Sequence, residues 1–296
     1  MCVHFGIRQP MRIFVVLIAF FLQSAVPNFG HAQTKCFFED KTRCSESFAY
    51  KKLTYTTGDV YYGATLENKR HGYGVYVWSG GHRYEGEWLD NVRAGYGVMS
   101  YSDGNRYDGE FRSDKSHGYG VYRYNDAGRF EGLYRNNSKV VGVRRFASAN
   151  RYSGEYRDNE YSGFGVFAFY DGDRYEGAYR KGVNYGWGIY AFSTGERKEG
   201  FWVNDSLPND WVYRTKKGDV WLFYDDRYIV SLTDAVQRQR DVIESVREEA
   251  AEGAAKGRAQ EKRALDAASQ ATAAVDQALE ARAKAREAAR LATLNN

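Results

Sequence analysis

The feature that most constrains this sequence is a short unit that returns at an almost constant spacing. Between Gly81 and Asp103 the chain reads GHRYEGEWLDNVRAGYGVMSYSD, in which a Tyr-x-Gly core is followed by a Gly-x-Gly pair. The core glycine recurs at Gly63, Gly86, Gly109, Gly132, Gly154, Gly177 and Gly200, so every step is 23 residues except one of 22. Such a period indicates a repeat architecture, in which each unit packs mainly on its neighbours.

Each unit is expected to form a β-hairpin. Tyr84, Gly86 and Trp88 alternate with charged residues, and a period of two favours a strand with one aromatic and one charged face. A second alternating segment follows Gly97, and a tight turn then suits a hairpin. A lone hairpin is only marginally stable, so the copies should stack. The predicted fold class is an all-β repeat array, an elongated antiparallel meander of about seven 23-residue β-hairpins over residues 58–217, followed by a long C-terminal α-helix.

The glycines of the repeat are predicted to be structural, because a side chain would disturb the aromatic face or a special backbone angle. They are Gly63, Gly72, Gly74, Gly86, Gly95, Gly97, Gly109, Gly118, Gly120, Gly154, Gly163, Gly165, Gly177, Gly186 and Gly188. Two copies depart from the pattern. The copy after Gly132 keeps only Gly142, and the copy after Gly200 has Asn209 and Trp211 in place of the glycine pair.

The Tyr-x-Gly-x-aromatic motif followed by Gly-x-Gly resembles the MORN (membrane occupation and recognition nexus) repeat, and the resemblance extends over residues 58–217. It implies a module for assembly and dimerisation, and together with the N-terminal segment described next it suggests an exported bacterial member. Phosphoinositide binding, proposed for such proteins, would need uncompensated basic charge. Here one arginine per repeat is followed two residues later by an acid in five of six copies, which favours an ion-paired ladder.

The N-terminus has the pattern of a targeting segment. Arg8 and Arg12 precede an apolar run of ten residues, and Gly30-His31-Ala32 resembles a signal-peptidase site. We expect residues 1–32 to be a signal peptide cleaved near Ala32, and the protein to be periplasmic or secreted. The alternative is an uncleaved N-terminal membrane anchor, although the apolar run is shorter than a spanning helix requires.

Export would place the cysteines in a compartment where disulfides form. Cys36 and Cys44 remain after cleavage, and an even pair in an oxidising compartment predicts a disulfide, with two free thiols as the alternative. They belong to an N-terminal segment, residues 33–57, that ends in a lead-in strand. Residues 218–232 are predicted to form closing strands.

Residues 233–296 are rich in Ala, Glu, Arg and Lys and predict the long helix. An apolar stripe includes Ile243, Val246, Leu265 and Leu279, and leaves two alternatives, a coiled coil or a solvated helix. Gly253 and Gly257 weaken the helix by about 1 kcal/mol each, so a hinge is expected there.

No enzymatic motif stands out, and we expect no catalytic residues, no cofactor and no metal site. The carboxylates recur because the repeat recurs, and His71 and His117 should lie too far apart to share a metal. A net charge of +4 is too small to indicate nucleic-acid binding.

The aromatic residues of the repeat are the candidate binding surface. Either they pack across strands, or they line a groove that accepts a protein partner. The candidates are Tyr84, Trp88, Tyr107, Phe111, Tyr152, Tyr156, Tyr175, Tyr179, Tyr190 and Trp202. Because one aromatic face should need cover, we expect a homodimer built on the later repeats. The predicted function is a non-enzymatic exported scaffold; the alternatives are a membrane- or envelope-surface binder and, third, a hydrolase using the groove.

Overall fold

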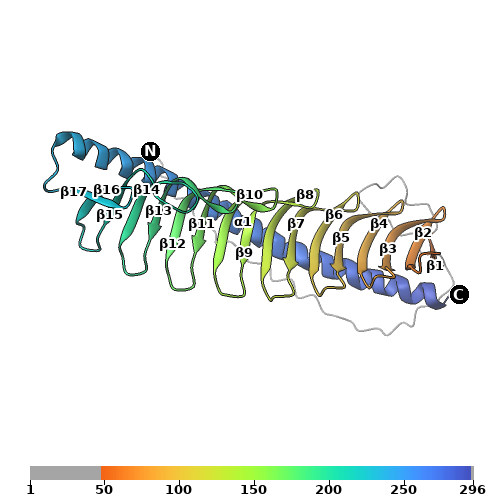
Figure 1. The fold of residues 1–296 in the computed structure, drawn as a ribbon. Coiled ribbons are helices and arrows are strands. Elements are labelled where there is room, and N and C mark those ends of the chain that lie inside the picture. Colours follow the sequence, from red (N-terminus) through yellow and green to blue (C-terminus); the bar gives the residue numbers. More distant parts are fainter. Residues whose placement is uncertain (1–47, 295–296) are drawn as a thin grey trace, which may run out of the picture. The chain divides into compact units, whose positions relative to one another are not determined.

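The computed structural model describes residues 48–294, which form one antiparallel sheet of 17 strands followed by a single long helix (Figure 1). This confirms the fold class predicted from the repeat. The predicted signal peptide and the Cys36/Cys44 pair lie outside the described residues. Within 48–294, no helix is both long and apolar enough to cross a membrane.

Every strand pairs with the next one in the chain, so the sheet is a simple meander. The first strand precedes the repeat array, and the last two strands follow it. In chain order the strands are β1 (Ala49–Thr54), β2 (Val60–Leu66), β3 (Lys69–Val77), β4 (Arg83–Leu89), β5 (Val92–Ser100), β6 (Arg106–Arg112), β7 (Lys115–Arg123), β8 (Arg129–Arg135), β9 (Ser138–Arg145), β10 (Arg151–Arg157), β11 (Glu160–Ala168), β12 (Arg174–Arg180), β13 (Val183–Ala191), β14 (Arg197–Trp202), β15 (Asp210–Arg214), β16 (Val220–Tyr224) and β17 (Arg227–Ser231).

The core glycines oppose one another across neighbouring strands. Gly86 lies opposite Gly74 on one side and Gly97 on the other, and the same pairing recurs along the array. The ring of Tyr84 lies over this row, because a Cβ added to Gly97 would come within 2.5 Å of the Tyr84 hydroxyl oxygen. That hydroxyl donates a 2.9 Å hydrogen bond to the carbonyl of Glu87. Glycine is therefore required wherever a tyrosine ring covers the strands.

The other aromatic side chains of this face pack edge-on against the tyrosines. The Tyr84 ring meets Trp88 at 5.2 Å and 89°, and Phe111 of the next hairpin at 5.1 Å and 80°. The arrangement repeats from copy to copy and joins the rings into one continuous hydrophobic cluster. Edge-to-face pairs of this kind contribute about 0.5–1.5 kcal/mol each beyond their burial.

The helix α1 (Gln237–Leu294) packs on the sheet along the whole distance from β15 back to β1 (Figure 1). At 1.5 Å per residue its 58 residues reach about 87 Å, whereas fourteen strand spacings of about 4.8 Å span about 67 Å. The helix is thus long enough to cross these strands without a break.

α1 covers the face opposite the tyrosine rings and does so mainly with alanine. Ala264 and Ala267 pack with Val141 and Val143, and Ala250 packs with Ile189. Leu265 and Leu279, assigned from the sequence to the apolar stripe, are instead about 40% exposed on the outer side of the helix. The stripe prediction was wrong at these two leucines, because the helix lies too close to the sheet for leucine, whereas Ala268 of the same predicted stripe is buried.

The expected hinge at Gly253 and Gly257 is also absent, since α1 is continuous through both. These glycines are the points of closest approach. A Cβ on Gly253 would lie 2.2 Å from the carbonyl oxygen of Trp187, and one on Gly257 would lie 2.7 Å from that of Gly165. Close contact between backbones, rather than flexibility, therefore explains why glycine stands at these positions.

Candidate functional site

The predicted aromatic binding residues do not line a groove. Tyr190 is partly buried, and the other nine candidates are between 0% and 8% exposed. They are buried because the tyrosine rings lie on the glycine rows and the second ring of each copy packs against them. The groove interpretation was therefore wrong. The alternative weighed with it, packing across strands, is what the structure shows.

Burial also removes these tyrosines from acid–base chemistry. It raises the pKa of Tyr84, Tyr156 and Tyr179 well above the ordinary value of 10. Their hydroxyl groups stay protonated at neutral pH, and they serve the packing of the sheet.

The charged face of the sheet carries the ion-paired ladder that the sequence predicts. Arg83 contacts Glu85 at 2.9 Å and Arg129 contacts Glu131 at 2.7 Å, and equivalent pairs join Arg106 to Asp108 and Arg174 to Glu176. Most of these acids are buried, so each needs its cation: a buried carboxylate without a partner is costly.

Helix α1 supplies further partners to the same acids. Arg282 and Arg286 approach Glu85 at 2.6 Å and 2.7 Å, while Arg258 pairs with Glu176 and Arg247 lies 3.6 Å from Glu199. Burial disfavours the charged form of Glu85, but hydrogen bonds from Arg286 and Arg83 and the charge of Arg282 outweigh it. They lower the pKa of Glu85 from 4.5 to about 2.

One copy of the ladder lacks its acid, and there the helix offers the opposite charge. Ser153 occupies the acidic position two residues after Arg151 and is fully buried. Glu261 of α1 reaches Arg151 at 2.8 Å and also pairs with Arg174. Arginines of the helix thus meet acids of the sheet, and the glutamate of the helix meets the copy without one. This complementarity favours a single register of α1 on the sheet.

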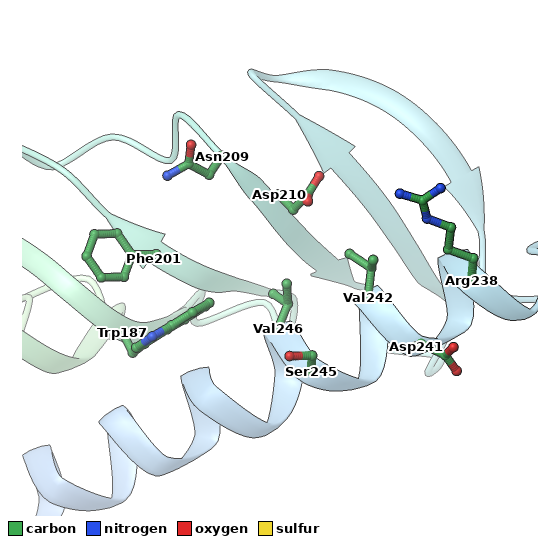
Figure 2. A pocket seen from close by; sticks show the side chains of 9 residues that line it. All are labelled: Trp187, Phe201, Asn209, Asp210, Arg238, Asp241, Val242, Ser245 and Val246. Atoms are coloured by element: carbon green, nitrogen blue, oxygen red, sulfur yellow. The ribbon is translucent and has the colours of Figure 1, made fainter.

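A cleft of about 770 Å³ lies where α1 meets β13, β14 and β15 (Figure 2). Figure 2 shows Trp187 and Phe201 side by side at one end, and their rings are 5.5 Å apart at 87°. Arg238 and Asp241 lie at the other end, and Asp210 lies between the two ends (Figure 2). The lining residues are Trp187, Phe201, Asn209, Asp210, Arg238, Asp241, Val242, Ser245 and Val246.

This cleft belongs to the copy after Gly200, in which Asn209 and Trp211 replace the glycine pair. The sequence identified that copy as irregular but gave no sign of a hollow, because the opposite wall comes from α1. The other irregular copy has a smaller cavity of about 230 Å³. Its Arg144 lies 3.6 Å from the ring centroid of Tyr124 and 3.7 Å from Asp126, so its charge is balanced.

Metal ligands do not cluster in the part of the chain that the structure describes: no three His, Cys, Asp or Glu side chains lie close enough to hold an ion. His71 is buried and its Nδ1 lies 3.2 Å from Asp90.

The MORN repeat family model matches four segments of the array, residues 66–83, 84–106, 107–129 and 152–174. The array therefore contains MORN repeats. The copy after Gly132 falls between the third and fourth matches, in keeping with its missing glycine. No curated protein matches this chain.

Solved structures show only weak likeness to this MORN protein. The SAS-4 TCP domain of Drosophila melanogaster, solved with a proline-rich motif of Ana2, is 10% identical, with 59% of this chain and 88% of that chain covered and a TM-score of 0.34. The TCP10 domain of Danio rerio CPAP is 11% identical, with 61% and 86% covered and a TM-score of 0.25. Neither likeness carries an argument about function.

The charge match at Ser153 yields a first prediction for the MORN array. Glu261→Gln should lower the free energy of unfolding by about 1–3 kcal/mol, because Arg151 and Arg174 lose a partly buried carboxylate. Adding Ser153→Asp should restore part of the loss, since aspartate occupies the same repeat position at Asp108. Urea unfolding measures both.

The matched control is Glu280→Gln, which removes an exposed glutamate paired with Lys284 on the same helix. It should change stability by less than about 1 kcal/mol. Equal effects of Glu261→Gln and Glu280→Gln would contradict the role given to Glu261.

The lowered pKa of Glu85 yields a second prediction. The stabilisation from its ionised form should be complete above about pH 4.5 and should disappear as the pH falls toward 2. The difference in unfolding free energy between the wild type and Glu85→Gln should therefore shrink over that range. Denaturant titrations at several pH values test this, and a difference that stays constant with pH would refute it.

Proposed function

We propose that this MORN protein is a non-enzymatic exported scaffold that works through protein contacts. The observation that carries the proposal is the docking of α1 across the charged face of the sheet. Ala and Gly provide the close fit, and ion pairs at Glu85, Glu176 and Glu199 fix the position. A sheet braced by a helix along its length should be stiff, and stiffness suits a scaffold that holds partner proteins in place.

We also propose that the protein is exported. It rests on the sequence of residues 1–32, and the periplasm or the medium after cleavage near Ala32 is the compartment we propose. The mass of the protein recovered from an expressing bacterium would distinguish a cleaved signal from a retained anchor.

The homodimer remains a prediction, but its original reason no longer holds. That reason is an aromatic face in need of cover, whereas in the structure the rings of that face bury one another and α1 covers the opposite face. Sedimentation equilibrium of the mature chain measures the state directly.

Membrane-surface binding has less support. Binding to anionic lipid needs basic side chains without counter-charges, and the arginines of the ladder are largely paired with acids. We therefore favour the scaffold function over membrane-surface binding.

The test is affinity capture with the mature full-length protein in extracts of its own host. We expect a defined partner to be retained in near-stoichiometric amount. Gly253→Val should abolish or weaken retention, because its side chain cannot fit against Trp187 and α1 would be displaced. Ala255→Val, on the exposed side of the same turn, is the matched control. Failure to retain any protein above a bead control, or turnover in a substrate screen, would overturn the proposal.

A further inference from the structure

The terminal cleft arises where the last copy of the repeat exchanges two residue types. The earlier copies place a glutamate, alanine or leucine after the core glycine, the glutamates being Glu87, Glu110 and Glu155, and this position becomes Phe201 in the last copy. They also place an aromatic residue between the two paired glycines, as at Tyr96 and Trp187. The equivalent position of the last copy is Asp210. The last copy thus has an aromatic ring, Phe201, on its first strand. On its second strand it has a carboxylate, Asp210, where the copies with a glycine pair have an aromatic ring.

The Asp210 carboxylate lies on the second strand of its copy, opposite the position of those glutamates, and makes no equivalent hydrogen bond. In earlier copies the glutamate accepts a hydrogen bond from a backbone N–H of the next strand; Glu87 does so from Tyr96 at 2.8 Å and Glu110 from Tyr119 at 2.8 Å. Among residues 48–294, the Asp210 carboxylate has no hydrogen bond or ion pair. Asp241, across the cleft, accepts only a 2.7 Å bond from the amide of Gln237.

The two rings beside Asp210 suit a positive charge. Trp187 and Phe201 stand nearly perpendicular, and the faces of aromatic rings attract a cation held within about 6 Å. Val242 and Val246 add an apolar wall that matches the aliphatic stem of a long basic side chain (Figure 2). The carboxylates of Asp210 and Asp241 outnumber the one cation in the lining, Arg238.

We propose that this cleft binds an arginine or lysine side chain of a partner polypeptide, with the charged group held between Trp187, Phe201 and Asp210. A volume of about 770 Å³ is within the usual range of ligand pockets, so a basic side chain and its flanking backbone fit. The proposal rests on the scaffold function, because it names the chemistry by which the scaffold recognises a partner.

Arg238 is the natural competitor for this position. It lines the cleft, and no acid of the described chain is paired with it. Because Arg238 and Asp241 stand three residues apart on α1, where side chains are neighbours, the guanidinium should compete with an incoming cation for that carboxylate. Arg238→Gln should therefore tighten the binding of a basic peptide.

The test is calorimetric titration of the full-length mature protein with acetylated tripeptide amides. The probes are Leu-Arg-Leu, Leu-Lys-Leu and the uncharged Leu-Gln-Leu. We expect the two basic peptides to bind at least about tenfold more tightly than the glutamine peptide, and Asp210→Asn to remove about tenfold of that affinity. Asp226→Asn, in the exposed turn between β16 and β17, is the matched loss of charge and should change nothing.

Equal affinity for the arginine and glutamine peptides would overturn the proposal, as would no binding of the basic peptides to either the wild type or Arg238→Gln. Affinity capture separates this failure from failure of the scaffold function. A partner retained equally by the wild type and Asp210→Asn would support the scaffold function and show that the cleft does not recognise that partner. Binding of the basic peptides without capture of any partner would support the cleft as a site for basic side chains and contradict the scaffold function.

Discussion

The backbone of α1 lies against the backbone of the sheet, and the rest of the structure depends on this close contact. Gly253 and Gly257 stand where a side chain would collide with Trp187 or Gly165, and alanines occupy most of the remaining buried positions. Such a stripe buries little apolar area per residue, so shape alone holds the helix weakly. Its length compensates, because the same shallow contact is repeated over many strands.

Charge adds the specificity that a stripe of small residues lacks. An alanine stripe could slide along a repeating sheet with little change in packing, because each repeat offers the same valine and the same carboxylate. The ladder breaks that equivalence, since among the six copies that carry the arginine only the copy of Arg151 has a serine, Ser153, in place of the acid. Glu261 is the residue of α1 that pairs with Arg151. The irregular repeats are therefore informative: one fixes the register of α1, and the other, at Asp210, opens the cleft.

The repeat made the sheet predictable, and long-range contact made the rest unpredictable. The 23-residue period and the alternation around Gly86 were enough to predict the hairpins, and Ala-rich composition was enough to predict α1. Neither the repeat period nor the composition predicts where α1 packs on the sheet, because that position depends on contacts between residues far apart in sequence. Arg286, for example, binds Glu85, which is 201 residues away in the chain. Leu265 seemed a better core residue than the alanines beside it, yet close packing turned it outward. The sequence left open whether the tyrosines pack across strands or line a groove, because nothing local shows a ring folding back over the glycines.

Hydrogen exchange of the α1 amides in the intact protein tests the docked helix most directly. A solvated helix of this composition, weakened by two glycines, would exchange quickly near Gly253 and Gly257. The docked arrangement predicts the opposite: amides from Ile243 to Ala285 should be protected to a degree similar to those of β11 to β13, with no fast segment at the glycines. Rapid exchange throughout that stretch, with the strands still protected, would contradict the account.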